Sequence, residues 1–421
     1  MKYFIVFLIA GLILLNNCEN KQLGKKVILP EINISKSTNG VVTLPLTVPE
    51  IVRDIFVKYT KLNAPNGKPI HFLAQDAWTE DQIVHARNVL KHILTDYVGS
   101  NLGNNKALVA NSMSEKRATM VLFNDTDELE KAFDGGLMNL DHSMQDLRSN
   151  ECPAVGDRDY MAHITRDASY EEIWHLVHDY GIIPVLPDMI SEMRYANDAA
   201  VRKGWEAWPE DEPQEHPNEY VGVLIDNYYD LWITEPKLYE AHNYEAGPKG
   251  TTHFGSYFAN GRIKMRIKDP LGYQLIEKFF HPYLTYNAQL PFDFQGTFSI
   301  KLDESKPYTY KSQHLIDVTL RGDNDANLVG NERENKLKGN LGDNAIYGFG
   351  GDDEIDGGEG NDTAVYRGTY NEYEIISTKE ITTISDRQIG RDGMDRLKNI
   401  EFIQFKKNKI LKLSSKKKLN D

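Results

Sequence analysis

The sequence is poor in cysteine and in basic residues. Of its 421 residues only two are Cys, and 48 Lys and Arg stand against 62 Asp and Glu, which gives a formal net charge of −14. This balance argues against a nucleic-acid partner, which needs a basic surface, and favours a solvated surface or cation binding. The hydrophobic share of 40% predicts a globular chain rather than a disordered one.

The hydrophobic run at the N-terminus is too short for a membrane span, which takes about 20 residues. Lys2 precedes this apolar run, Tyr3–Leu15, and the combination is typical of an export signal. The run ends in Leu15-Asn16-Asn17-Cys18, which resembles a bacterial lipobox. The resemblance implies a lipid on Cys18 and an anchor at the cell surface or outer membrane. The alternative is simple secretion after cleavage near Asn17.

If Cys18 is acylated, Cys152 has no partner within the chain, and the fold cannot then rest on disulfide bonds. At this length we expect an α+β multidomain protein. The predicted parts are a signal with lipobox (1–18), a polar tether (19–45), a mainly helical domain of unknown role (46–320), a short parallel β-roll (321–368), a small β cap (369–410) and a basic tail (411–421).

The predicted roll rests on a repeat of nine residues. Its glycines and its apolar residues recur at this step: Gly330, Gly339, Gly348 and Gly357, and Leu328, Leu337, Ile346, Ile355 and Ala364. A fixed period indicates a solenoid, and one apolar residue per nonapeptide predicts a parallel β-roll with a thin core. Glycine permits tight turns, and Asp or Asn at the sixth place supplies the hard oxygen ligands that Ca²⁺ prefers.

These units resemble the calcium-binding repeats-in-toxin (RTX) pattern G-G-x-G-x-D-x-U-x, where U is a large apolar residue. The resemblance implies that each calcium ion lies between two turns that are two repeats apart. Turn 357–362 would pair with turn 339–344, and turn 348–353 with turn 330–335. The implied ligands are Asp362 and Asn344 with carbonyls near Gly342 and Gly360 in the first pair, and Asp353 and Asn335 in the second.

Each implied pair has one carboxylate at the sixth place, and Arg333 replaces a glycine. Because a lower ligand charge weakens a calcium site, we expect few ions and modest affinity. The alternative is a flexible linker rich in Gly, Asp and Asn. Five apolar residues in register argue against that alternative.

The residues after the repeat predict a cap. Tyr373–Ser377 and Ile381–Ser385 alternate in the manner of paired strands. The stretch Gly390–Leu397, followed by Ile400–Phe405, resembles the flank that commonly follows RTX rolls. The resemblance implies that this flank closes the open end of the roll, as solenoids require.

Earlier in the chain, Ser169–Gly181 predicts a helix with an N-cap at its first residue and a stop at its last. Glu171 and His175 lie four residues apart and therefore share a face of this helix. Two carboxylates and two imidazoles within three turns could bind a transition metal. The alternative is that the acidic residues stabilise the start of the helix and that His175 is a core histidine.

The pattern E-E-x-x-H of this helix also resembles the H-E-x-x-H helix of zinc peptidases. The resemblance implies that Glu171 and His175 bind Zn²⁺ and that Glu172 is the catalytic general base. Glu219, which opens the next long predicted helix (Glu219–Trp232), is the best third ligand.

Residues 70–232 also resemble an uncharacterised family of exported proteins from bacteria and marine protists. The shared features are the helix around His85–Leu90, the strand Ala118–Phe123, the segment Tyr170–His175 and the pair Glu219-Tyr220. This resemblance implies a real domain but no known reaction. Two functions therefore stay open: a calcium-binding surface protein, or a metal-dependent hydrolase whose roll assists folding outside the cell.

Overall fold

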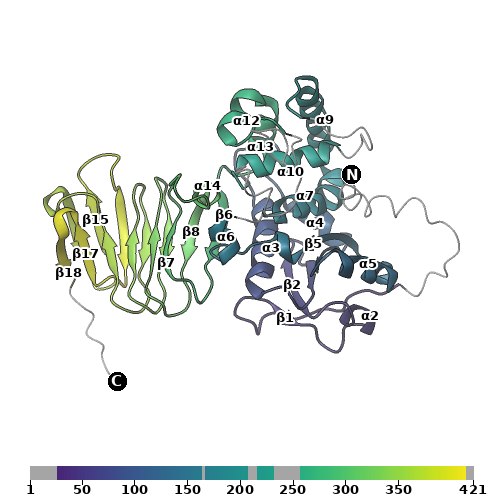
Figure 1. Ribbon diagram of the computed structural model, residues 1–421, viewed down its shortest axis with the longest axis horizontal. Helices are drawn as coiled ribbons and strands as arrows, with labels where there is room; N and C mark the ends of the chain where they lie inside the picture. The colour runs from purple at the N-terminus through teal and green to yellow at the C-terminus, as the bar shows by residue number, and fades with distance from the viewer. Residues whose placement is uncertain (1–25, 164–165, 207–215, 232–256, 414–421) are drawn as a thin grey trace. The chain divides into compact units, whose positions relative to one another are not determined.

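The computed structural model describes residues 26–163, 166–206, 216–231 and 257–413 (Figure 1). The predicted signal with Cys18 and most of the basic tail lie outside these ranges. The chain divides into two compact units, the first made of residues up to 87, 107–150 and 172–187, the second of 88–106, 151–171 and 188–421. Helices and strands both occur, which is compatible with the predicted α+β class. No helix in the described ranges has the length and apolar character needed to cross a membrane.

The first unit contains a five-stranded sheet with the order β1-β2-β3-β4-β5. The two pairs formed by β2 are antiparallel, and β3, β4 and β5 are parallel. All six residues of β4 are buried, because a parallel strand inside a sheet is covered on both faces. Of the four six-residue strands in this sheet, β2 to β5, only β4 was predicted from the sequence. The strands are β1 (Val42–Thr43), β2 (Lys58–Asn63), β3 (Pro69–Ala74), β4 (Ala118–Phe123) and β5 (Ser143–Arg148).

The described part of the predicted tether is folded. Val27 forms a parallel bridge with Leu140, and Leu29, Ile32 and Leu44 are buried in the hydrophobic core of the first unit. The prediction of a tether is wrong for residues 26–45. Its apolar residues fall in short runs, Val27–Leu29 and Val41-Val42, separated by a mostly polar stretch, so no sustained helical or strand period runs through the segment.

The helix expected over Ser169–Gly181 is present as α7 (Ser169–Val177), but it does not stop at Gly181. It continues as a π-helix (His178–Ile182) and then as α8 (Ile183–Val185). A Cβ on Gly181 would lie 2.6 Å from Cγ1 of Val109 on α4. Glycine therefore allows this close approach to α4 instead of ending the helix.

The other helices are short to medium in length. Two of the expected helices are present: the one around His85–Leu90 lies within α3, and the described part of the one expected over Glu219–Trp232 corresponds to α10. The helices are α2 (Glu50–Arg53), α3 (Glu80–Ile93), α4 (Ala107–Glu115), α5 (Thr126–Asp134), α6 (Arg158–Ala162), α9 (Pro187–Arg202), α10 (His216–Tyr228), α12 (Arg262–Lys268), α13 (Pro270–Phe279) and α14 (Thr309–Ser312).

The repeats form a parallel β-roll of two sheets within the second unit (Figure 1). Successive strands alternate between the sheets, so strands that pair are 18 residues apart: Leu337 lies opposite Ile355, and Ile346 opposite Ala364. The five strands are β9 (Ala326–Val329), β10 (Lys336–Lys338), β11 (Ala345–Tyr347), β12 (Glu354–Asp356) and β13 (Thr363–Val365).

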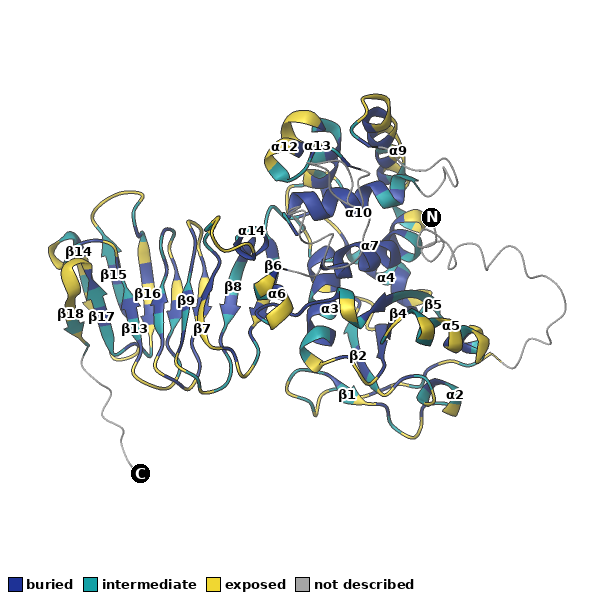
Figure 2. Cartoon of the chain, viewed as in Figure 1, coloured by how far each residue is buried: buried dark blue, intermediate teal, exposed yellow. Residues whose placement is uncertain are grey.

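The core of the roll is the line of apolar residues that the period of nine predicts. These residues are at most 2% exposed: Leu328, Leu337, Ile346, Ile355 and Ala364. Most of their neighbours along each strand are half-buried or exposed (Figure 2). In β10 to β13, one buried side chain per strand is therefore the whole apolar filling of each layer.

Both parallel sheets are longer than the repeat segment. Before the repeats, β6 (Leu284–Gln289) pairs with β8 (Leu315–Thr319), and β7 (Gly296–Ser299) pairs with β9. After them, β16 (Met394–Lys398) pairs with β12, and β17 (Phe402–Phe405) with β13. The parallel structure therefore extends on both sides of residues 321–368.

Antiparallel strands follow the repeats, as the alternation in Tyr373–Ser377 and Ile381–Ser385 predicts. β14 (Tyr373–Ser377) and β15 (Thr382–Asp386) form a hairpin, and β15 also pairs with β16. The other sheet ends in β18 (Lys409–Lys412), which is antiparallel to β17. Each sheet of the roll thus has an antiparallel strand at its C-terminal edge.

Candidate metal sites

The turns between the roll strands stack in two columns. In column one, turn 348–353 lies on turn 330–335, and in column two, turn 357–362 lies on turn 339–344. Backbone hydrogen bonds join the layers: the amide of Gly350 donates to the carbonyl of Asn331 at 3.0 Å, and that of Glu359 to the carbonyl of Asn340 at 2.9 Å. These are the pairs of turns that the RTX resemblance implies.

Sixth-position side chains link the layers of each column. Oδ1 of Asp353 accepts a hydrogen bond from the amide of Asn335 at 2.8 Å, and Oδ1 of Asp362 accepts one from the amide of Asn344 at 2.8 Å. All four residues are at most 2% exposed. The structure therefore brings these four predicted ligands together in the two expected pairs.

The second oxygen of each carboxylate, Oδ2 of Asp353 and of Asp362, is buried and has no hydrogen-bond partner among the described residues. Burial, together with nearby carboxylates, raises the pKa of both groups to about 7. A buried acceptor without a donor is costly, and a bound cation removes that cost. Since Ca²⁺ prefers carboxylate and carbonyl oxygens, these residues fit calcium.

The two predicted glycines lie against each other in column two. Gly360 has φ +113, and a Cβ on it would collide with the carbonyl of Gly342. The absence of side chains therefore lets these two backbone segments approach closely. Column one differs, because Arg333 occupies the fourth position of its first turn. The guanidinium of Arg333 donates to the carbonyl of Gln313 at 3.2 Å.

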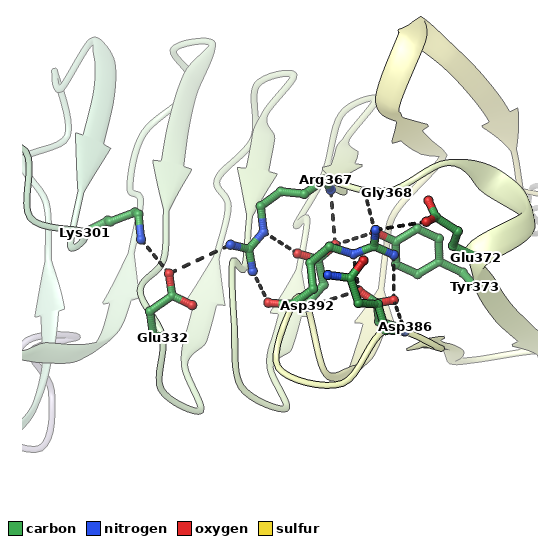
Figure 3. A network of polar contacts seen from close by, with 10 residues as sticks. Lys301, Glu332, Arg367, Gly368, Glu372, Tyr373, Asp386 and Asp392 are labelled. Atoms are coloured by element: carbon green, nitrogen blue, oxygen red, sulfur yellow. Dashed lines mark hydrogen bonds and ion pairs between the residues drawn. The ribbon is translucent and has the colours of Figure 1, made fainter.

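A network of charged side chains surrounds column one (Figure 3). Glu332 pairs with Lys301 at 2.5 Å and with Arg367 at 3.9 Å. Arg367 also pairs with Asp392 at 2.5 Å, and in the cap Arg391 pairs with Asp386 at 2.6 Å. The acidic members of this network are therefore already neutralised by basic partners.

On α7, the predicted zinc ligand Glu171 belongs to the second unit and His175 to the first, and the predicted third ligand Glu219 lies on α10 of the second unit. Glu172, the predicted general base, accepts a hydrogen bond from Nε2 of Gln145 at 2.8 Å. All four predicted residues lie in buried or half-buried positions. Zinc binding by these residues stays a prediction.

Glu171 also has a buried cationic partner that the sequence analysis missed. The guanidinium of Arg166 pairs with Glu171 and, at 3.0 Å, with Asp226. The side chains of all three are at most 6% exposed. Burial alone lowers the pKa of Arg166, but the two carboxylates raise it well above its usual value. Arg166 therefore competes with any metal ion for Glu171.

Comparisons with known proteins bear on the roll alone. Residues 329–364 match the family model described as RTX calcium-binding nonapeptide repeat, with four copies. No curated protein matches the chain. Residues 329–364 are therefore RTX calcium-binding repeats, as their turns indicate. The resemblance of residues 70–232 to an exported family stays a prediction.

Among solved structures, the chain is similar to the extracellular lipase LipA from Serratia marcescens. The identity is 17% and the TM-score 0.12, over 20% of this chain. The chain spans only 15% of the length of that lipase. A likeness of this size carries no argument about the fold or activity of the rest of the chain.

Proposed function

We propose that this chain is an exported surface protein, anchored by a lipid on Cys18, whose C-terminal roll binds calcium ions. The observation that carries calcium binding is the pair of buried carboxylate oxygens, Oδ2 of Asp353 and of Asp362, that lack a hydrogen-bond donor among the described residues. The RTX repeats at 329–364 support the same conclusion. Export rests on the apolar run at the N-terminus, and the anchor rests on the lipobox-like Leu15–Cys18.

Each column offers one carboxylate and one amide at the sixth position, with turn carbonyls to complete the coordination. Asp353 and Asn335 serve column one; Asp362 and Asn344 serve column two. The single charge per pair supports modest affinity, since ligand charge tunes calcium binding over several decades. A surface protein outside the cell meets enough calcium to fill such sites.

The direct test is a calcium titration of the full-length protein by isothermal calorimetry. We expect saturable binding, and we expect Asp362→Asn to remove one ion or to weaken it by about tenfold, because the substitution removes the charge from column two. Asp323→Asn is the matched control, since Asp323 is exposed and does not occupy a sixth position. Heat release that does not saturate, or equal effects of both substitutions, would contradict the assignment.

A second candidate function is a metal-dependent hydrolase centred on Glu171, His175 and Glu219. The E-E-x-x-H pattern on α7 supports it, and the ion pair of Arg166 with Glu171 opposes it. In this function Zn²⁺ would activate a water molecule, and Glu172 would accept its proton.

The zinc content of the protein tests whether this metal site exists. If it exists, protein loaded with Zn²⁺ and then desalted retains one equivalent, and His175→Ala loses it. The control is His178→Ala on the following helical turn, where the imidazole instead contacts Asp179 at 2.7 Å. Wild-type protein that retains no zinc after loading excludes the hydrolase function.

A further inference from the structure

The flank contains one more nonapeptide of the RTX kind, outside the segment that matches the family model. Residues 390–398 read G-R-D-G-M-D-R-L-K, with Gly at the first and fourth positions, Asp395 at the sixth and Leu397 at the eighth. The β14–β15 hairpin lies between this unit and the repeats. Because the inserted hairpin breaks the period of nine, a search for a constant step does not find the unit.

The structure places this unit as the next layer of column one. Leu397 lies opposite Ile355 in the paired strands β16 and β12. Gly393 has φ +75, as Gly351 has φ +101, and a Cβ on Gly393 would collide with the carbonyl of Gly351. The amide of Met394 donates to Oδ1 of Asp352 at 2.9 Å. Turn 390–395 therefore stacks on turn 348–353 as that turn stacks on turn 330–335.

The hydrogen bonds that join sixth-position residues of neighbouring turns continue into this layer. The amide of Asp353 donates to Oδ1 of Asp395 at 3.0 Å, just as the amide of Asn335 donates to Asp353. Asp353 and Asp395 are each 1% exposed. This pair of turns thus has two carboxylates at the sixth position, where each pair within the repeats has one carboxylate and one amide.

These two carboxylates are not neutralised by the charged network beside them. Arg367 is engaged by Asp392, and Arg391 by Asp386 (Figure 3). Oδ2 of Asp353 is buried without a hydrogen-bond partner in the part of the chain that the structure describes. Two buried carboxylates at adjacent layers repel each other unless a cation lies between them. A hard divalent cation of the size of Ca²⁺ fits this combination of carboxylate and turn carbonyl oxygens.

We propose that turns 348–353 and 390–395 bind an additional calcium ion through Asp353 and Asp395, and that this ion fastens the cap to the roll. The proposal deepens the proposed function and depends on it. With two carboxylates, this site binds calcium more tightly than the pairs within the repeats. The cap is then ordered at a lower calcium concentration than the repeat turns alone would require.

The test is a calcium titration of full-length Asp395→Asn by isothermal calorimetry. We expect the number of bound ions to fall by one and the tightest binding step to weaken by roughly tenfold or more. The amide oxygen of Asn still accepts the hydrogen bond from Asp353, so the layer itself is retained. Glu380→Gln, at the exposed tip of the hairpin, removes the same charge and leaves the titration unchanged.

Hydrogen exchange supplies a second readout, and its wild-type measurement does not depend on the folding of a variant. In wild-type protein we expect calcium to protect the backbone amides of β14 and β15 from exchange at the concentration that fills the tightest site. In Asp395→Asn this protection should require a higher calcium concentration. The amides of β11 should stay protected as in wild type. Calcium binding with unchanged stoichiometry and affinity in Asp395→Asn overturns this site alone. A wild-type protein that binds no calcium overturns the proposed function as well.

Discussion

In excess chelator at about pH 8, the repeat segment is expected to lose its β structure and to be cut by protease, and added calcium should restore both properties. The cause is the burial of Asp353 and Asp362, whose carboxylates are ionised at that pH and lack a neutralising partner in the described structure. The thin core of one apolar residue per strand cannot offset such a cost. Limited proteolysis with mapping of the cut sites, and far-ultraviolet circular dichroism, measure the change.

In excess chelator at about pH 5.5, the repeat segment should instead keep more of its β structure and resist protease better than at about pH 8. The pKa of Asp353 and Asp362 is about 7 and that of Asp395 about 8, all above the ordinary 3.8, with burial as the first cause. The folded state therefore binds protons more tightly than the unfolded state. The stabilisation by protonation is complete below the ordinary pKa and is lost as the pH rises through about 7 to 8.

In chelator, then, the segment should resist protease better at about pH 5.5 than at about pH 8. In calcium the order reverses, because protons compete with calcium for the same carboxylates. The double variant Asp353→Asn, Asp362→Asn should be more resistant than wild type in chelator at about pH 8, and less responsive to calcium. Equal resistance to protease in chelator and in calcium, at both about pH 5.5 and about pH 8, would show that the cation has no part in folding the roll.

Replacing the buried guanidinium of Arg166 by an apolar side chain should be strongly destabilising. Arg166→Met leaves the carboxylates of Glu171 and Asp226 buried without their cation, and breaking such a group costs about 3–5 kcal/mol. The midpoint of urea unfolding, followed by tryptophan fluorescence, should fall accordingly. Arg158→Met is the matched control: Arg158 is exposed, and its replacement should change the free energy of unfolding by about 0.5 kcal/mol or less.

This variant also bears on the second candidate function. If Glu171 were primarily a zinc ligand, Zn²⁺ would recover most of the stability lost in Arg166→Met, since a metal ion replaces the missing positive charge. If the pair is structural, zinc leaves the midpoint unchanged. A midpoint equal to that of wild type without zinc would mean that the ion pairs of Arg166 contribute little.

The roll could be predicted from the sequence because its information is local and periodic. Gly357 and Ile355 have equivalents nine residues away, and the strand pairing 18 residues apart follows once alternate units enter opposite sheets. The β14–β15 hairpin was predicted from alternation alone. The unit at 390–398 was missed because the hairpin shifts it out of step, although its own residues match the pattern.

The first unit was harder to predict, for physical reasons. The buried strand β3 (Pro69–Ala74) follows β2 (Lys58–Asn63) after a short turn. Neither strand alternates cleanly between apolar and polar residues, so periodicity does not separate strand from loop in this stretch. The folded segment around Leu29 and Ile32 owes its order to contacts with residues about a hundred positions later, such as Leu140. The partnership of Arg166 with Asp226 likewise depends on chain topology, which one sequence does not reveal.

The antiparallel strands at the C-terminal edge of the roll have a consequence for self-association. A parallel stack of identical short strands would offer its last backbone edge to the first strand of a second molecule, and such stacking could continue into fibres. Here the edge strand β18 reads Lys-Ile-Leu-Lys and runs against the direction of the stack, with Lys409 and Lys412 exposed at its two ends. The charged lysines on this edge and its reversed direction oppose the docking of another copy, so the stack of strands ends within a single molecule.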